Sequence, residues 1–358
     1  MNTIGKSLRL TIFGSSHGEG VGCVLDGVPP GLPITVEEIQ KEVDLRRPAE
    51  GIGTPRHEED MVQVLSGSKD GLATGGAITL FIANKDRDSS KYLKFRDMPR
   101  PGHADYTAVQ KYGDSHDIRG GGQFSGRLTA PIVAAGAVAR KLLTEHGVTI
   151  GAYTESVGRV IDAKPRTLQE IVSFGRTNDV RAAAMDTAEL MRQEILDAKA
   201  EGDSVGGTVR CVVEGLPVGV GEPFFDTVEG ELAKMMFAIP AVKGIEFGAG
   251  FRAVGMRGSE CNDPFIVVDG RLRTSKNDAG GVLGGITNGM PVEFRVAFKP
   301  TASISKPQRT VDLREMSERE LMIEGRHDPC IVPRAVSVVE AAAALVLADL
   351  MVRGGFID

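Results

Sequence analysis

Tryptophan is absent from this 358-residue sequence, and all aromatic residues together make up only 5% of it. Proteins that bind single-stranded nucleic acid stack bases on exposed aromatic rings, so this composition disfavours that function. Basic residues are not in excess either: 42 lysines and arginines stand against 48 aspartates and glutamates, for a formal net charge of -6. We therefore expect no nucleic-acid partner.

Long hydrophobic runs and clustered cysteines are also missing. No stretch approaches the roughly 20 consecutive apolar residues that span a bilayer, and the N-terminus lacks the apolar core and cleavage site of a signal peptide. The four cysteines, Cys23, Cys211, Cys261 and Cys330, are widely spaced and form no C-x-x-C pair. This spacing favours reduced thiols over disulfides or zinc ligands. We expect a cytoplasmic protein with no membrane contact and no bound metal.

Glycine, by contrast, is abundant. The 45 glycines form about 13% of the chain, where about 7% is typical. They are concentrated at positions 14 to 22, 120 to 122, 244 to 250 and 280 to 289. Such clusters permit positive φ angles and close approach of the backbone to a ligand.

The hydrophobic pattern predicts an α/β (α+β) protein in which residues 1–358 form one domain with antiparallel or mixed sheets. The expected strands are Leu8–Phe13, Met61–Leu65, Ala77–Asn84, Gly207–Val213 and Pro291–Phe298. The expected helices are a short one that follows a capping box at Thr35 and Glu38, a buried one over Thr129–Leu143, a surface one over Thr187–Ala200 and a buried one over Ala335–Met351. Thr129 is expected to act as the cap of the second of these helices. A long polar loop is expected over Lys85–Pro101. Regular βαβ alternation is missing, which disfavours a Rossmann fold.

Two loops place a histidine among small residues. Residues 14–20 read GSSHGEG and follow a predicted strand, and residues 100–106 read RPGHADY. Imidazole is the usual proton donor at neutral pH, but an isolated loop histidine is more often structural or merely exposed. In the second loop, Asp105 is close enough in sequence to orient or charge His103.

Three further segments carry polar groups suited to anions. Residues 117–127 read DIRGGGQFSGR before a helix, where backbone N–H groups with Arg119 and Arg127 favour a phosphate or carboxylate; a flexible turn with solvated arginines is the alternative. Residues 325–334 read GRHDPCIVPR, in which the prolines are expected to keep the backbone extended. Residues 299–304 read KPTASI and offer an ammonium and two hydroxyls.

Taken together and in this order, these segments resemble the chorismate synthases. The resemblance runs from about Lys6 to Leu350 and includes GSSHGEGVG, RPGHADYT, AVKGIEFGAGF, KPTASISKPQ and GRHDPCIVPRA. It implies a layered β-α-β sandwich, a homotetramer and a carbon–oxygen lyase of the shikimate pathway of aromatic amino acid biosynthesis. The implied reaction is the anti-1,4-elimination of phosphate from 5-enolpyruvylshikimate 3-phosphate to give chorismate, with reduced FMN as the required cofactor.

The resemblance also assigns roles to residues. His17 corresponds to the histidine thought to protonate reduced flavin, His103 to the one that assists departure of phosphate, and Asp328 to the carboxylate beside the flavin N5. Ser16 and Ser125 correspond to serines of proposed proton relays. Substrate contacts map to Arg46, Arg47, Arg100, Arg127 and Arg326. Flavin contacts map to Ser125, Gly126, Gly284, Lys299, Pro300, Thr301, Ala302, Ser303 and Arg326.

The sequence departs from the family pattern in two places. After the three glycines the family usually has R-S-S-A-R-E-T, whereas residues 123–129 of this chain read QFSGRLT; after residues 46–48 the stretch 49–54 is one residue short and lacks an arginine. A non-catalytic flavin- or phosphate-binding homologue is therefore the alternative. Some members of the family reduce their own FMN with NADPH, but no added reductase domain is present, so we expect an external flavin reductant.

Overall fold

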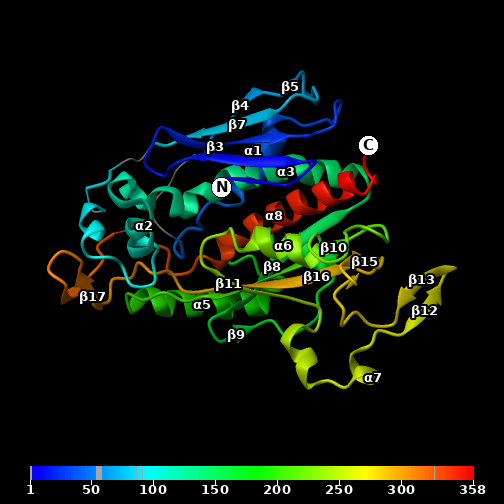
Figure 1. The fold of residues 1–358 in the computed structure, drawn as a ribbon. Coiled ribbons are helices and arrows are strands. Elements are labelled where there is room, and N and C mark those ends of the chain that lie inside the picture. The colour runs from blue at the N-terminus through cyan, green and yellow to red at the C-terminus, as the bar shows by residue number, and fades with distance from the viewer. Residues whose placement is uncertain (1, 54–58, 86–87, 91, 326) are drawn as a thin grey trace.

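Two five-stranded sheets enclose a layer of helices in the computed structural model, which describes residues 2–53, 59–85, 88–90, 92–325 and 327–358 (Figure 1). Every strand pair within these ranges is antiparallel. The predicted layered β-α-β sandwich is confirmed. Antiparallel or mixed sheets were expected, and the sheets of the described residues are antiparallel.

The strands of the first sheet are, in spatial order, β1 (Thr3–Ile4), β2 (Arg9–Gly14), β3 (Gly20–Asp26), β7 (Ile78–Ala83) and β4 (Val62–Ser66). Those of the second are β11 (Val242–Phe247), β16 (Val292–Phe298), β10 (Gly207–Glu214), β8 (Thr149–Val157) and β9 (Val160–Ile161). Four two-stranded ribbons complete the set: β5 (Ser68–Lys69) with β6 (Leu72–Ala73), β12 (Phe265–Val268) with β13 (Arg271–Thr274), β14 (Val282–Leu283) with β15 (Ile286–Thr287), and β17 (Gln308–Asp312) with β18 (Ser317–Leu321).

The α-helices are α1 (Val36–Asp44), α2 (Asp105–Tyr112), α3 (Thr129–Glu145), α4 (Leu168–Phe174), α5 (Met185–Ala200), α6 (Val228–Met236), α7 (Gly258–Cys261) and α8 (Val332–Arg353). Short 3-10 helices cover Leu93–Arg96, Gly113–Ser115, Arg119–Phe124, Gly126–Leu128 and Gly250–Gly255.

Helices α3 and α8 form the central layer. Helix α3 packs on β3 and β7 of the first sheet, and α8 packs on β8 and β10 of the second. A β-carbon on Gly136 of α3 would lie only 2.3 Å from the β-carbon of Ala341 of α8, so glycine is what lets the two helices approach. Because α8 is covered on all sides, it is apolar nearly all round.

The length and composition of α8 would also suit a membrane span, but 94% of its most apolar window is buried inside the protein. That degree of burial is typical of the core helix of a globular fold.

Most predicted elements are confirmed with ends shifted by a few residues. The capping box of α1 forms as expected, with Thr35 and Glu38 each bonded to the other's backbone N–H. The expectation for the segment before α8 was wrong in part: Pro333 lies in the first turn of the helix instead of extended backbone. A proline is tolerated there because the first N–H groups of a helix have no intrahelical partner. All four cysteines are free.

Candidate active site

A cavity of about 750 Å³ lies where α3 and α8 begin and where β16 ends. Among the described residues, seven cationic side chains and two carboxylates line it: Arg46, Arg47, Arg100, Arg127, Lys243, Lys299 and Arg334, with Asp60 and Asp328. The N-terminal ends of two helices add further positive potential. The cavity is therefore strongly electropositive in a protein of negative net charge, and anions with several charges are the ligands it suits.

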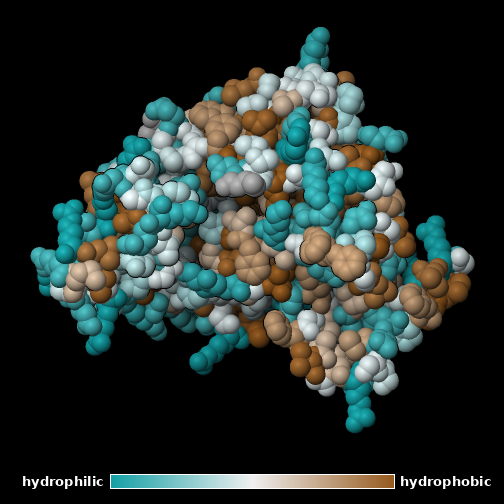
Figure 2. Space-filling view, viewed as in Figure 1, coloured by the Kyte–Doolittle hydropathy of each residue, from teal (hydrophilic) through white to brown (hydrophobic). Residues whose placement is uncertain are grey.

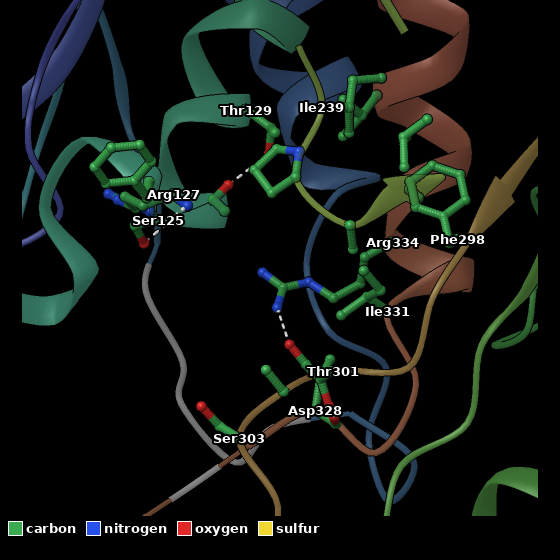
Figure 3. Close-up of a pocket in the computed structure, with 18 of the residues that line it drawn as sticks. Ser125, Arg127, Thr129, Ile239, Phe298, Thr301, Ser303, Asp328, Ile331 and Arg334 are labelled. Atoms are coloured by element: carbon green, nitrogen blue, oxygen red, sulfur yellow. Dashed lines mark hydrogen bonds and ion pairs between the residues drawn. The ribbon is translucent and has the colours of Figure 1, made fainter. Parts of the chain in front are cut away.

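One wall of the cavity is apolar. The segment 237–242, which connects α6 to β11, contributes this wall together with Phe298, Ile331, Ala335 and Val338. Figure 3 shows Ile239, Phe298 and Ile331 on one side of the space, and Ser125 and Arg127 across from them. A flat ring with polar substituents would fit between these surfaces.

His103 belongs to a three-residue cluster at the cavity. Its Nδ1 lies 2.6 Å from Oδ1 of Asp105, and Arg100 Nη2 lies 2.8 Å from the same oxygen. A carboxylate oxygen accepts hydrogen bonds, so this contact assigns the Nδ1 proton to the bond with Asp105. Nε2, which lies 3.2 Å from Arg100 Nη2, is then the ring nitrogen left for proton transfer. The predicted proximity of Asp105 to His103 is confirmed.

Asp105 is held ionised by these neighbours. Burial alone would raise its pKa, but hydrogen bonds from Arg100 and His103 outweigh burial and lower the pKa well below its usual range. Arg100 makes a second bond to Asp105 through Nε at 2.7 Å and lies 4.5 Å from the ring centre of Phe95. Arg100 is thus packed as a support for the His103–Asp105 pair, with Nη1 also 3.2 Å from Ser303 Oγ.

Replacing Asp105 by asparagine should lower the free energy of unfolding by about 3–5 kcal/mol, because the buried Arg100 would lose its counter-charge. The depressed pKa stabilises the native protein above the unfolded-state value of about 3.9, and this stabilisation is lost as the pH falls below it. Urea unfolding at several pH values would measure both effects. This account of Asp105 would be contradicted if the variant were as stable as the parent at pH 7. It would also be contradicted if the stability of the variant fell at acidic pH as much as that of the parent.

His17 and Ser16 lie behind the wall of the cavity and do not line it. Nδ1 of His17 is 2.7 Å from Ser89 Oγ, and its ring stands edge-on to Tyr92, which is a lining residue. Ser16 donates to the carbonyl oxygen of Gly120 at 2.9 Å. Both side chains are buried, with 5% and 1% of their surface exposed.

The glycine loop brings the two predicted histidines to the same place. Gly120, Gly121 and Gly122 all have positive φ, at 61°, 84° and 53°. A β-carbon on Gly120 would lie 2.2 Å from the His17 ring, and one on Gly121 would lie 3.8 Å from the His103 ring. The loop therefore runs between the two imidazoles, and its first glycine is required by that close approach.

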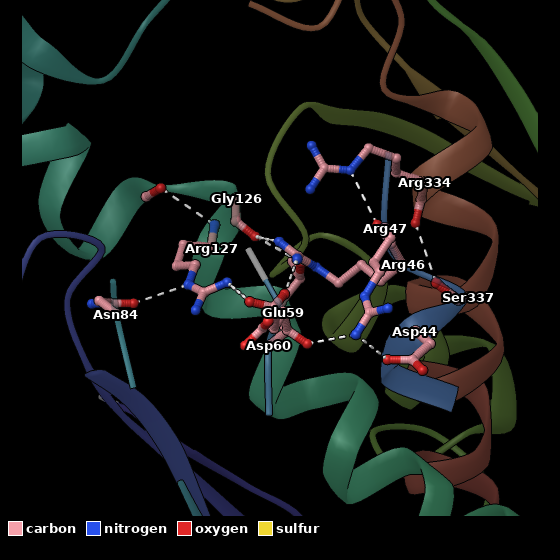
Figure 4. A network of polar contacts seen from close by, with 12 residues as sticks. Asp44, Arg46, Arg47, Glu59, Asp60, Asn84, Gly126, Arg127, Arg334 and Ser337 are labelled. Carbon is pink, nitrogen blue, oxygen red and sulfur yellow. Dashed lines mark hydrogen bonds and ion pairs between the residues drawn. The ribbon is translucent and has the colours of Figure 1, made fainter. Parts of the chain in front are cut away.

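Of the two arginines predicted to flank this loop, only one lines the cavity. Arg127 is buried there with Arg46, and the two are joined by Asp60 (Figure 4). Arg119 instead forms a bidentate, half-exposed pair with Asp117, with bonds of 2.8 and 2.9 Å. The alternative of a solvated arginine thus holds for Arg119. Arg47 lies at the rim and is bonded to Asp44 at 2.8 Å.

Thr129 was predicted to cap α3, and this is wrong. Thr129 lies inside the helix, and its hydroxyl donates to the Gly126 carbonyl at 2.7 Å while accepting from Arg46 Nε at 2.8 Å. The hydroxyl therefore holds a pocket arginine, a task that the local sequence does not indicate.

Asp328 faces the cavity paired with an arginine that sequence reasoning missed. Nη1 of Arg334 lies 2.5 Å from Asp328 Oδ2 (Figure 3). Nε of Arg334 donates to the Arg46 carbonyl oxygen at 3.1 Å (Figure 4). Arg334 ends the GRHDPCIVPR motif, six residues after Asp328 and two after Val332, the first residue of α8. Because α8 begins at Val332, Arg334 lies in the first turn and points at the site.

Lys299, Thr301, Ala302 and Ser303, four of the residues predicted to contact flavin, line the cavity. Thr301 Oγ1 donates to the Asp328 carbonyl oxygen at 3.0 Å, which ties this segment to the one before α8. Lys243 was not predicted, although it lies in the AVKG motif. Burial first, and then the neighbouring Lys243, lower the pKa of Lys299, so an anion between the two ammonium groups would relieve their repulsion.

Three predicted flavin contacts are not placed on the cavity. Pro300 lies between two lining residues without lining it, and Gly284 lies in the turn between β14 and β15. That turn precedes β16, whose far end borders the cavity; a strand of this length spans about 20 Å. Arg326 lies outside the described residues.

The first departure from the family pattern lies at the cavity. Gln123, Phe124 and Gly126, which differ from the family pattern, line it, and so do the retained Ser125, Arg127 and Thr129. None of residues 49–53 of the second stretch lines it. In the second stretch Thr54 lies outside the described residues. Arg46, Arg127 and Arg334 together still supply three guanidinium groups to the cavity.

Comparisons with known proteins agree on one family. The family model described as chorismate synthase matches residues 8–352. A chorismate synthase of Dehalococcoides mccartyi is 53% identical over 357 residues, which cover 99% of this chain and 98% of that protein. One from Korarchaeum cryptofilum is 50% identical over 350 residues, covering 98% of this chain and 97% of that protein.

A solved structure described as a crystal structure of chorismate synthase superposes with a TM-score of 0.78 at 30% identity, covering 98% of this chain and 93% of that one. Sequence, fold and pocket chemistry point the same way. The chain belongs to the chorismate synthase family, whose members are lyases of the shikimate pathway.

Proposed function

We propose that the electropositive cavity binds 5-enolpyruvylshikimate 3-phosphate beside reduced FMN and eliminates phosphate to give chorismate. The observation that carries this proposal is the set of seven arginine and lysine side chains around one cavity that His103 also lines. A substrate with one phosphate and two carboxylates requires such a concentration of positive charge.

The residues present also fit a flavin. The apolar segment 237–242 with Ile331 offers a surface for the ring system, and Lys299, Thr301 and Ser303 offer an ammonium and two hydroxyls for polar substituents. When bound, reduced FMN would supply the electron-rich partner that the family's elimination requires. The further flavin contacts assigned to Ser125, Gly126, Pro300, Ala302, Gly284 and Arg326 remain proposals.

Each protein group has a proposed task in this reaction. The C3–O bond of the substrate breaks, the C6 proton is lost, and the electrons form the new double bond. His103 gives a proton to the departing phosphate through Nε2 while Asp105 orients its ring. Arg46, Arg47, Arg100 and Arg127 bind or orient the substrate's anionic groups. His17 would protonate bound reduced FMN, with Ser16 and Ser125 as proton relays, and Asp328 would assist uptake of the C6 proton on the flavin side.

An anaerobic assay of the purified protein tests the proposal. With photoreduced FMN and 5-enolpyruvylshikimate 3-phosphate we expect chorismate and inorganic phosphate in equal amounts. With oxidised FMN and NADPH we expect no product, since the reductant is proposed to be external. Binding of both ligands without turnover would support the alternative, a non-catalytic flavin- or phosphate-binding homologue.

Replacing Asp328 by asparagine should leave FMN binding intact and slow turnover about 100-fold, within the range typical for removing one group that assists proton transfer. Flavin fluorescence titration and single-turnover kinetics would measure the two quantities. If the variant instead fails to bind flavin or unfolds, Asp328 is structural through its contact with Arg334, and its proposed role beside the flavin is wrong.

A homotetramer in the cytoplasm is proposed as well. Exposed apolar side chains gather on the β12–β13 ribbon, where Phe265, Val267 and Leu272 are 62%, 73% and 66% exposed (Figure 2). Such a surface favours burial against another copy. The place of Gly284 beyond the far end of β16 supports this: if it contacts flavin, it reaches the cavity of a neighbouring subunit. Sedimentation equilibrium would give the mass.

The single domain over residues 1–358 is supported by one apolar core that includes residues of both sheets, α3 and α8.

A further inference from the structure

We propose that Asp60 is a positioning residue, which fixes the guanidinium groups of Arg46 and Arg127 in the orientation that the substrate's anionic groups require. This inference rests on the proposed function, because that function assigns the two arginines to the substrate. Asp60 ends the R-x-E-x-D stretch that resembles the chorismate synthases, but the resemblance assigns it no role.

The carboxylate of Asp60 joins two arginines that are far apart in sequence. Its Oδ2 lies 3.5 Å from Nη1 of Arg46, and its Oδ1 forms an ion pair with Nη1 of Arg127 (Figure 4). All three side chains are at least nine-tenths buried, with 6%, 7% and 8% of the side-chain surface exposed for Asp60, Arg46 and Arg127. A carboxylate with both oxygens used in this way constrains both guanidinium planes.

The other contacts of the two arginines leave little freedom. Arg46 donates from Nε to Thr129 Oγ1 and from Nη2 to the Gly126 carbonyl oxygen, each at 2.8 Å. Arg127 donates from Nε to Asn84 Oδ1 at 3.0 Å. A guanidinium has five N–H donors in a fixed fork, so fixing three directions also fixes those that face the cavity.

The backbone of Asp60 is itself held in place. Its φ is 46°, a left-handed conformation that aspartate tolerates better than most residues. Gln40 of α1 donates from Nε2 to the Asp60 carbonyl oxygen at 3.2 Å and accepts from the Val62 N–H at 2.9 Å. Helix α1 therefore both leads the chain to Arg46 and anchors the carboxylate that orients it.

The negative charge of Asp60 also has an effect that opposes anion binding, because it lowers the positive charge of the cavity. Burial first, and then the nearby Arg334, lower the pKa of Arg46 to about 9, and Asp60 opposes this shift. Removing the charge of Asp60 would make the cavity more positive, which by itself favours anions. It would also let Arg46 and Arg127 repel each other and turn away. Because charge-assisted bonds to phosphate and carboxylate depend on geometry, we expect the loss of orientation to dominate.

Equilibrium binding of 5-enolpyruvylshikimate 3-phosphate to the protein with oxidised FMN tests the inference, since no turnover is expected in that state. For Asp60→Asn and for Asp60→Glu we expect binding at least tenfold weaker, with KM raised by a similar factor and kcat changed less. Normal or tighter binding by Asp60→Asn would overturn the inference. So would wild-type binding by Asp60→Glu, because that variant keeps the charge and moves only its position.

A double-mutant cycle tests whether Asp60 acts through the arginines. In an Arg127→Ala background, Asp60→Asn should weaken binding less than threefold further, whereas a full additional tenfold loss would contradict a positioning role. Asp162→Asn is the matched control: Asp162 is 3% exposed and paired with Arg166 at 2.8 Å, but it does not line the cavity. The Asp162→Asn variant should bind the substrate as tightly as the parent does.

If Asp60→Asn does not fold, Gln40→Ala gives an independent answer, since Gln40 holds the Asp60 backbone without lining the cavity. We expect about threefold weaker binding, and unchanged binding would overturn the inference. The result that would refute the proposed function differs from the results that would refute the role of Asp60. A parent protein that binds substrate but forms no chorismate with photoreduced FMN would refute the reaction and leave the binding test of Asp60 standing.

Discussion

Replacing His103 by alanine is expected to lower turnover by about 10²–10⁴-fold, the range typical of general acid catalysis, while the fold is retained. The ring lies at the cavity with Nδ1 bonded to the buried Asp105. With the Nδ1 proton held in that bond, Nε2 is the nitrogen through which the protonated ring would give a proton to the departing phosphate. Single-turnover kinetics with photoreduced FMN would measure the loss, and circular dichroism would confirm the fold.

The matched control for this variant is His146→Ala. His146 is an exposed histidine at the end of α3, bonded through Nδ1 to the Leu142 carbonyl oxygen at 2.9 Å. It should keep the parent's turnover. Near-normal turnover in His103→Ala would remove His103 from the mechanism, and an equal loss in both variants would indicate a general effect of losing an imidazole.

Replacing Gly120 by alanine is expected to lower turnover about 100-fold or more. The new β-carbon would lie 2.2 Å from the His17 ring and 2.5 Å from Ser16 Oγ, so both side chains must move. Movement of His17 would disturb its contacts, because its ring is 5% exposed, stands edge-on to Tyr92 and is bonded to Ser89. The displacement would remove one proposed proton donor and shift the loop that separates it from His103.

A backbone effect must be separated from this collision, because Gly120 has a φ of 61°. Gly147→Ala provides the comparison: Gly147 has a φ of 77°, and a β-carbon there would meet nothing within 4 Å. Both variants should lose about 1 kcal/mol of stability from the left-handed backbone. Only Gly120→Ala should lose turnover as well. Full activity in Gly120→Ala would show that the position of His17 does not matter to the reaction.

The elements that the sequence predicts well are those with strong local signals. The capping box at Thr35 and Glu38 starts α1 as expected, and the apolar runs over 129–143 and 335–351 lie inside the two central helices. Where a prediction was wrong, a tertiary contact had replaced the local one. Thr129 accepts a hydrogen bond from Arg46 instead of capping its helix, because a buried guanidinium without an acceptor is costly in free energy.

The site was predictable only as a set of motifs. His103, Asp328, Arg127 and the KPTAS segment were identified, and all of these residues except Pro300 line one cavity. Lys243, Arg334 and Asp60 were missed as site residues although each lies in a stretch that resembles the family, because a motif does not indicate which of its charged side chains will face the cavity. Arg334 and Asp328 are six residues apart, but their contact depends on where α8 begins.

By itself, the sequence determined the family resemblance, the apolar helices and the identity of the histidine loops, because each depends on residues adjacent along the chain. Only the tertiary structure decided which charges face the cavity. Arg46, Asp60 and Arg127 come from three separate segments, and their ion pairs exist because α1, α3 and the first sheet meet at that point. Burial makes those contacts strong, and burial is a property of the packed molecule, not of any one segment.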